Sequence, residues 1–345
     1  MWTKRCLKSI LKIKNGTDYK KVENKKGKYG VYGTGGLITH TDNFLIDKPT
    51  VCIGRKGTIN RPMFFNTPIW TVDTLFYSDI KNADPRFVFY LFQTINWNKY
   101  NQSTGVPSLT SEGIEKINSF IPNSITEEKR ISSFLSLIDK RINILSNKIS
   151  ILKKYKEGLD QTAFTEGSTI KLGSLIEQLN IRNKSLKKIH IFSISNQFGF
   201  IPQEDIFLGK TISLKNKKNY KIVEKYQFAY NPARINVGSI ACQTYDIGQV
   251  SPMYIVFKTE RNNVEILNEW FHSRFFIKEI NSNLEGSVRK ILTFESLSNL
   301  LIKWPKDGLI YSRAFAKVNL KINLLLQQLN DLKMLKKYLL NKLFV

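Results

Sequence analysis

Four short stretches carry residue types that catalysis or cofactor binding uses. Gly209-Lys210-Thr211 resembles the end of a phosphate-binding loop, but such a loop needs a glycine where this chain has Glu204. The glycines of residues 33–36 lack the spacing of a dinucleotide-binding turn and predict a tight turn. The stretches that begin at Asn231 and Ser251 lack the second proline of an amino-methyltransferase motif. We also find no carboxylate pattern of a metal-dependent nuclease, so recognition or assembly is favoured over catalysis.

The charge of the chain indicates a polyanionic partner. Among 345 residues, 53 Lys and Arg stand against 28 Asp and Glu, a net charge of +25. Neutralising phosphates and releasing counterions favours nucleic-acid binding by such a chain. Many Lys, Asn and Ile residues are also typical of an AT-rich genome, which accounts for part of this charge.

Cysteine and histidine are few and scattered, without the spacing of a zinc site or a disulfide framework. We interpret the three histidines as structural and the three cysteines as those of a reducing compartment. The basic amino terminus is interrupted by Lys8 and Lys12, and no apolar run reaches the roughly 20 residues of a membrane span. A cytoplasmic protein without a bound metal is expected. The six residues are Cys6, Cys52, Cys242, His40, His190 and His272.

An internal repeat organises the chain. The motif Leu-Lys-Lys-Tyr occurs at 152–155 and, 183 residues later, at 335–338. The same offset relates Leu-Thr-x-Glu at 109–112 to its copy at 292–295. Nearer the amino terminus the offset falls to 165, because Leu-x-Ser recurs from Leu7 at Leu172. One unit is therefore used twice, with a longer front part in the second copy.

The rear of each unit predicts a long helix. Residues 123–157 and 309–345 contain neither glycine nor proline, and their apolar residues recur in steps of four and three. Thr126 is a suitable N-cap and Gly158 a suitable stop. Two such helices, each about 50 Å long, can pack antiparallel as a coiled-coil rod that relates two heads by a pseudo-twofold axis. The predicted helix seam consists of Ile131, Leu135, Ile138, Ile142, Leu145, Ile149, Leu152, Val318, Ile322, Leu325, Leu329 and Leu332.

The remaining segments predict two globular α+β heads. Their short β-branched and aromatic runs are broken by Gly, Pro and Asn, and residues 265–280 read as a helix. The predicted boundaries are 1–125 for head 1, 126–166 for the first helical spacer, 167–305 for head 2 and 306–345 for the second helical spacer.

Seven stretches carry a family resemblance: VYGTGG (31–36), IGRKGTI (53–59), WTVDTLFY (70–77), EEKRISSFLSLIDKRI (127–142), KYKEGL (154–159), YNPARINVGSI (230–240) and VSPMYIVF (250–257). With the repeat, they resemble the specificity subunit of a type I restriction–modification system. The second helix departs from the pattern, because it lacks the acidic-basic opening of the first.

The resemblance implies two target-recognition domains that each read one half of an asymmetric, bipartite site on double-stranded DNA. It further implies two modification (methyltransferase) subunits that bind S-adenosylmethionine, and a restriction subunit that uses ATP and Mg. None of these cofactors is expected on this chain, which would be non-catalytic.

Candidate DNA-binding residues follow from polar and basic side chains in glycine-flanked turns, where backbone can approach phosphate. The same residue types also serve turn chemistry alone. The candidates are Tyr32, Thr34, Arg55, Lys56, Thr58, Ser103 and Thr104 in head 1, and Asn231, Arg234, Asn236, Ser239, Ser287, Arg289 and Lys290 in head 2.

Three alternatives stay open at this point. The chain could belong to a two-headed system that cuts on both sides of its site (type IIB-like), which neighbouring genes would distinguish. It could be a non-catalytic coiled-coil scaffold, which predicts no DNA sequence preference. A stand-alone methyltransferase or nuclease would need a cofactor pocket.

Overall fold

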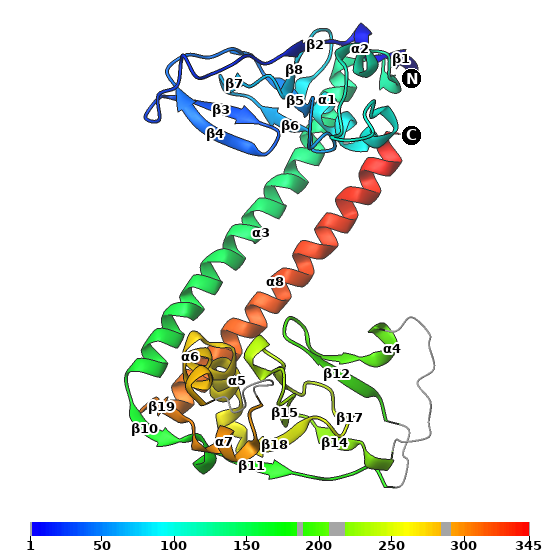
Figure 1. Cartoon of the computed structure of the whole chain (residues 1–345). Coiled ribbons are helices and arrows are strands. Elements are labelled where there is room, and N and C mark those ends of the chain that lie inside the picture. The colour runs from blue at the N-terminus through cyan, green and yellow to red at the C-terminus, as the bar shows by residue number, and fades with distance from the viewer. Residues whose placement is uncertain (1, 185–188, 207–217, 284–290, 345) are drawn as a thin grey trace. The chain divides into compact units, whose positions relative to one another are not determined.

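The computed structural model describes residues 2–184, 189–206, 218–283 and 291–344. The chain divides into two compact units, 1–147 with 327–345 and 148–326. Each unit combines one head with the adjoining parts of both long helices. Figure 1 draws the whole chain with its elements labelled.

Head 1 is built on two small sheets. The four-stranded sheet has the order β2-β8-β5-β6, and the three-stranded sheet has the order β4-β3-β7. A separate antiparallel pair, β1 with β9, joins the first and last strands of the head, with Trp2 opposite Pro122. The strands are β1 (Trp2–Cys6), β2 (Leu11–Asn15), β3 (Tyr29–Gly33), β4 (Gly36–Thr41), β5 (Thr50–Gly54), β6 (Met63–Phe65), β7 (Trp70–Thr71), β8 (Leu75–Ile80) and β9 (Asn118–Pro122).

Two short helices complete head 1. Helix α1 (Pro85–Thr94) begins where the Asp84 carboxylate accepts a 2.8 Å hydrogen bond from the Phe87 N–H, with proline at the first helical position. Helix α2 (Ser111–Glu115) is capped by Thr110, whose hydroxyl accepts from the Gly113 N–H. The apolar face of α1 packs on β5 and β6 in one buried core. Figure 1 shows α1 beside β5 and α2 beside β2.

In the first unit the long helices α3 (Ile125–Thr165) and α8 (Gly308–Leu343) run antiparallel, because residues later in α3 contact residues earlier in α8. Ile131 and Phe344 pack against the same buried cluster, while Asp139 further along α3 pairs with Lys336. Leu135, Ile138 and Leu340 form a buried cluster with Tyr90 of α1. The predicted antiparallel pair of long helices is confirmed in this unit.

Head 2 repeats this design with one addition. Its sheets have the orders β11-β18-β15-β16 and β13-β12-β17-β14. Its first and last strands also pair, with Ser168 opposite Trp304. The strands are β10 (Ser168–Lys171), β11 (Ile176–Leu179), β12 (Ile191–Ser195), β13 (Gly199–Pro202), β14 (Lys221–Glu224), β15 (Phe228–Tyr230), β16 (Ile240–Cys242), β17 (Ile247–Val250), β18 (Ile255–Thr259) and β19 (Leu301–Trp304).

The two heads correspond strand by strand. The pairs β2–β8, β8–β5 and β5–β6 have counterparts in β11–β18, β18–β15 and β15–β16, and parallel β3–β7 has its counterpart in β12–β17. The extra length of the second copy lies between β13 and β15, where 203–227 stand in place of 42–49. This segment contains α4 (Gln203–Ile206) and β14. The internal repeat predicted from the offsets is thus present in the fold.

Two predicted boundaries were wrong. Helix α3 begins at Ile125, one residue before the predicted cap, and it continues past Gly158 to Thr165. Gly158 does not end the helix because Ala163 and Phe164 of the next turns are buried in the head 2 core, so burial outweighs the low helix propensity of glycine. The chain turns instead at Gly167, in a positive-φ conformation.

The predicted helix 265–280 is two helices, α5 (Val264–His272) and α6 (Arg274–Asn283). Ser273 between them has extended backbone, and its hydroxyl donates a 2.7 Å hydrogen bond to the carbonyl of Trp270. The break lets both helices bury their apolar faces in the same core. Helix α7 (Phe294–Asn299) follows later in the chain and is capped by Thr293.

In the second unit α3 and α8 are again antiparallel, since Lys156 contacts Asn319 while Phe164 stacks on Phe315. Eight seam residues are buried along the two helices, and four are half-buried. The buried ones are Leu135, Ile138, Leu145, Ile149, Val318, Ile322, Leu325 and Leu329, and the half-buried ones are Ile131, Ile142, Leu152 and Leu332.

Candidate nucleic-acid interface

In head 1, three loops meet beside the β3–β4 hairpin. Its two-residue tip, Thr34-Gly35, is closed by Gly36, whose φ of +114° suits glycine. The Thr34 side chain approaches the next loop, because a Cβ added at Gly54 would lie 3.2 Å from its Cγ2 and one at Gly57 3.7 Å from its Oγ1. The glycine-rich stretch is the tight turn that the sequence predicted.

The third loop, residues 101–108, is tied to the second by backbone hydrogen bonds. The Gly57 N–H donates to the Pro107 carbonyl at 2.8 Å, and the Leu109 N–H donates to the Arg55 carbonyl at 2.9 Å. Asn101 orders the loop, since its Oδ1 accepts from the N–H groups of Ser103 and Ser108. These bonds hold glycine-flanked polar side chains on one surface of head 1.

The head 1 candidates differ in exposure on this surface. Lys56, Thr58 and Thr104 are exposed, whereas Thr34, Arg55 and Ser103 are partly covered. Tyr32 packs its ring against Phe65 with ring centroids 4.5 Å apart, which gives it a packing role as well. A long, exposed lysine can follow a phosphate, and short hydroxyl side chains suit base edges or the sugar–phosphate chain.

In head 2 the equivalent surface is the turn between β15 and β16. Asn231 and Ser239 are buried, and Asn231 Oδ1 accepts from the Ala233 N–H at 3.1 Å while the Asn231 N–H donates to the Ser239 carbonyl. These side chains shape the turn. Arg234 and Asn236 are the exposed members of the predicted set. Ser287, Arg289 and Lys290, like the Gly209-Lys210-Thr211 stretch, lie outside the described residues.

This turn lies beside the tip of the β12–β13 hairpin. A Cβ added at Gly238 would lie 3.1 Å from the Cβ of Asn196, and the Ser239 hydroxyl donates to the Ile194 carbonyl at 3.4 Å. The tip residues Asn196, Gln197 and Phe198 are all exposed. Sequence reasoning missed them, although Asn-Gln-Phe-Gly between two apolar runs is a hairpin signal.

Each head is anchored to both long helices by a polar cluster around a carboxylate. In the first unit, Asp139 of α3 accepts a 2.8 Å hydrogen bond from the Tyr90 hydroxyl of α1 and pairs with Lys336 of α8 at 2.7 Å. Burial, followed by the hydrogen bond to Asp139, raises the pKa of Tyr90 well above its usual range, so the phenol stays protonated as the donor. One carboxylate thus joins three helices.

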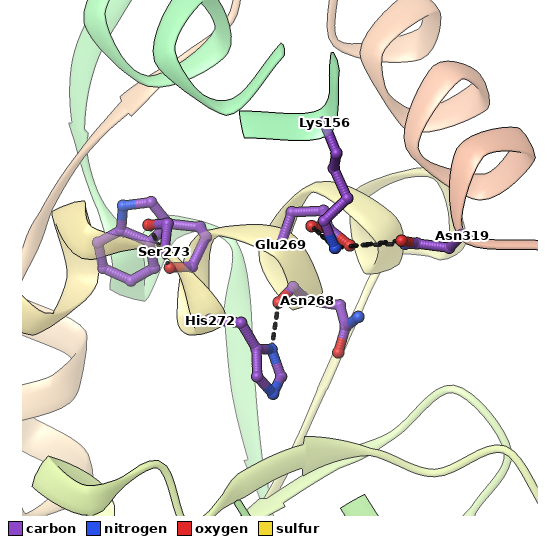
Figure 2. A network of polar contacts seen from close by, with 7 residues as sticks. Lys156, Asn268, Glu269, His272, Ser273 and Asn319 are labelled. Carbon is purple, nitrogen blue, oxygen red and sulfur yellow. Dashed lines mark hydrogen bonds and ion pairs between the residues drawn. The ribbon is translucent and has the colours of Figure 1, made fainter. Parts of the chain in front are cut away.

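In the second unit the central carboxylate comes from the head and the lysine from α3, and Figure 2 shows this cluster. Glu269 of α5 is almost fully buried and pairs with Lys156 of α3 at 2.7 Å. Its other oxygen accepts a 2.6 Å hydrogen bond from Asn319 of α8, whose carbonyl accepts from Lys156 at 3.1 Å. In both clusters the lysine comes from the part of its helix that carries the repeated Leu-Lys-Lys-Tyr motif.

Asp160 lies one turn after Lys156 on α3. Its Oδ1 is buried and has no hydrogen-bond partner among the described residues. Burial, and next the negative charge of Glu269, raise the pKa of Asp160 to about 7. The second cluster therefore contains a carboxyl group that titrates near neutral pH.

Within the described ranges, no group of three or more His, Cys, Asp or Glu side chains could hold a metal ion. Among the helices of these ranges, none combines the length and apolar character that crossing a bilayer requires.

Comparisons with known proteins agree with this architecture. Residues 1–154 match the family model of the type I restriction modification DNA specificity domain. The whole chain has the fold of the type I restriction–modification system S subunit from M. genitalium, with a TM-score of 0.75 at 15% identity over 100% of this chain and 96% of that one.

More distant likenesses extend over a similar length. A structure described for complex assembly and conformational transition of the type I R-M system gives a TM-score of 0.48 at 12% identity, covering 99% of this chain and 97% of that one. The HsdS subunit from Thermoanaerobacter tengcongensis gives 0.40 at 11% identity, covering 99% and 96%. No curated protein matches the sequence. The resemblance to this family is therefore confirmed by the match of residues 1–154 to its model, and the whole chain has the fold of an S subunit.

Proposed function

We propose that this chain is the DNA-recognition subunit of a type I restriction–modification complex, in which each head reads one half of an asymmetric, bipartite site on double-stranded DNA. One observation carries the proposal. The two heads share one strand order and present loop surfaces at the same place in it, yet these surfaces differ in sequence and length. Two heads with the same strand order and different loop surfaces are suited to binding two different half-sites.

The exposed side chains of the two surfaces divide the work of binding. Lys56 in head 1 and Arg234 in head 2 provide positive charge for phosphates or guanine edges. Thr58, Thr104 and Asn236 provide short polar groups for base edges and the sugar–phosphate chain. The net charge of +25 supports a salt-dependent affinity for any DNA, on which base contacts impose specificity.

The long helices set the length of the unread spacer and dock two modification subunits. The large apolar side chains that remain exposed along α3 and α8 support the docking role, because apolar patches on a protein surface mark sites of protein contact. The modification subunits supply S-adenosylmethionine and adenine methylation, and a restriction subunit supplies ATP- and Mg-dependent chemistry, while this chain is non-catalytic and acts in the cytoplasm. The most exposed of these residues are Leu137, Ile151, Ile310, Leu320, Met334 and Tyr338.

Methylation mapping tests the proposal. The chain is co-expressed with the modification subunit of its own system in a methylation-free host, and the DNA is sequenced for N6-methyladenine. A split motif with two different halves and a fixed gap is expected. Replacing residues 167–305 with the second head of another specificity subunit should change one half of the motif and leave the other half and the gap unchanged.

Two outcomes would contradict the proposal. A well-expressed, assembled complex that leaves no methylation, with a chain that prefers no DNA sequence, would favour the coiled-coil scaffold. Cleavage on both sides of a methylated split site would place the chain in a type IIB-like system instead, with the reading function of the heads retained.

A further inference from the structure

The tip of the β12–β13 hairpin in head 2 exposes an unusual set of side chains. Between the paired residues Ser195 and Gly199, the loop consists of Asn196, Gln197 and Phe198. Phe198 is 70% exposed, although phenylalanine is among the residue types most often buried. An amide pair next to a largely exposed phenyl ring is a combination that a loop with only a connecting role does not need.

The tip is held in one conformation. The Ser195 hydroxyl accepts hydrogen bonds from the N–H groups of Gln197 at 3.1 Å and of Phe198 at 3.3 Å. Gly199 then closes the loop at a φ of +66°, which a residue with a side chain rarely adopts. Because its backbone is fixed in this way, the loop presents Gln197 at its apex and Phe198 beside it without a large entropic cost on binding.

The tip also lies on the predicted interface. The Gly238 turn touches Asn196, and the same turn carries the exposed residues Arg234, Asn236 and Val237. Positive charge, amides and apolar side chains therefore share one surface of head 2. A two-stranded ribbon with such a tip fits the major groove, where the bases expose both polar edges and the thymine methyl group.

The chemistry of the tip selects one kind of base pair. A glutamine amide can donate to N7 and accept from the N6 amino group of adenine, and an apolar side chain is matched by the thymine methyl. We propose that the β12–β13 tip reads an A·T pair in the half-site of head 2, with Gln197 on the adenine and Phe198 on the thymine methyl. This inference rests on the proposed function and names the base pair that one element of the interface selects.

Head 1 supports the inference through its equivalent hairpin. The β3–β4 tip carries Thr34, and directly after it Leu37 and Ile38 are about half exposed. Both heads thus present apolar side chains at the same hairpin, although the sequences of the two tips differ. A shared place with different side chains is what two readers of different half-sites require.

Methylation mapping of point variants in the full complex tests the assignment. Gln197→Ala and Phe198→Ala should each relax one position of one half-site, and that position should be an A·T pair in the wild-type motif. We expect discrimination at this position to fall by about tenfold or more, the effect of losing one base-edge contact. Ile277→Ala, a change at a half-exposed apolar residue of α6 in the same unit, should leave the motif unchanged.

A binding measurement separates the two roles. The purified complex is titrated with a duplex that carries the mapped motif, and with the same duplex in which uracil replaces the thymine of that pair. The wild-type complex should bind the uracil duplex several-fold more weakly, and the Phe198→Ala complex should bind both equally. Gln197→Ala should still distinguish thymine from uracil, because the methyl contact is intact.

Three results would overturn the inference. The first is a motif unchanged by both variants. The second is a Phe198→Ala complex that binds both duplexes more weakly than the wild type by the same factor, so that it still prefers thymine to uracil. The third is failure of the Phe198→Ala chain to assemble with its modification subunits, which would assign the ring to a protein contact. Each leaves the proposed function standing, because a split wild-type motif would still be present, whereas the absence of any motif would contradict the proposed function itself.

Discussion

Lys156 of α3 and Glu269 of α5 form an ion pair of 2.7 Å in which the carboxylate is almost completely buried. Removing the lysine would leave that charge with Asn319 as its remaining partner in the cluster. We expect Lys156→Met to lower the free energy of unfolding by about 2–4 kcal/mol, the usual result of breaking a buried pair from one side. Chemical denaturation of the full chain measures it.

The double variant Lys156→Met with Glu269→Leu distinguishes the pair from general packing. Because an apolar pair avoids the desolvation of two charges, the double variant should lose clearly less than the sum of the two single variants. Lys153→Met, at an exposed position of α3, serves as the matched control and should change stability little. Additive losses would show that the ion pair does not couple α3 to α5.

Asp160 should make the stability of the second unit depend on pH. Its folded-state pKa of about 7 lies above the 3.8 of an ordinary aspartate, so its contribution to stability is fully present below pH 3.8 and is lost progressively as the pH rises from there through 7. Asp160→Asn should therefore raise stability at pH 8, by about 1–2 kcal/mol after allowance for solvent screening, and by less than half as much at pH 5. Thermal unfolding at both values checks this.

Glu166→Gln provides the control for Asp160, because Glu166 is exposed just after the end of α3 and is not among the charges that shift the pKa of Asp160. It should shift the melting temperature by similar small amounts at pH 5 and pH 8. An Asp160→Asn variant whose effect is independent of pH would show that this carboxyl group does not titrate near neutrality.

Two glycines of the helix–head junction should respond oppositely to alanine. Gly167 has a φ of +151°, and a Cβ there would come within 2.2 Å of the Trp304 carbonyl oxygen, so Gly167→Ala should destabilise the chain or prevent folding. Gly158 lies inside α3 with no atom within 4 Å of such a Cβ, so Gly158→Ala should stabilise by about 0.5–1 kcal/mol. Melting temperatures of both variants give the comparison.

The equivalent caps Thr110 and Thr293 should be equivalent in energy as well. Each hydroxyl accepts a 3.1 Å hydrogen bond from the backbone three residues on. Each Thr→Ala change should cost about 1 kcal/mol, and the two costs should add because the residues belong to different units. Thr→Ser at either position keeps the cap and should cost much less; an equal cost would assign the loss to the methyl group instead.

The repeat and the helices could be predicted from the sequence because they depend on local, periodic signals. Constant offsets relate Thr110 to Thr293, and steps of four and three residues placed the seam on one helix face. The end of α3 could not be predicted this way, since whether Gly158 ends a helix depends on the burial of Phe164 in a core formed by distant strands. The break at Ser273 has the same cause.

The candidate interface was predictable only in part. Glycine-flanked turns indicated the loops at Thr34, Lys56 and Asn231, and the structure shows that the first two are neighbours. Composition could not separate buried Asn231 and Ser239 from exposed Arg234, because turn formation and base reading use the same residue types. Phe198 was missed because the candidates were chosen for polar and basic side chains in turns.

The paired terminal strands of the heads have a consequence for how this protein can change over generations. In head 2, β10 and β19 lie side by side, so the chain enters and leaves the head at one place, with Ser168 opposite Trp304. A genetic exchange between these two positions can bring in a segment of different length, as 203–227 in place of 42–49 illustrates, without interrupting either long helix. The fold thereby separates the part of the gene that can diversify from the part that must stay constant.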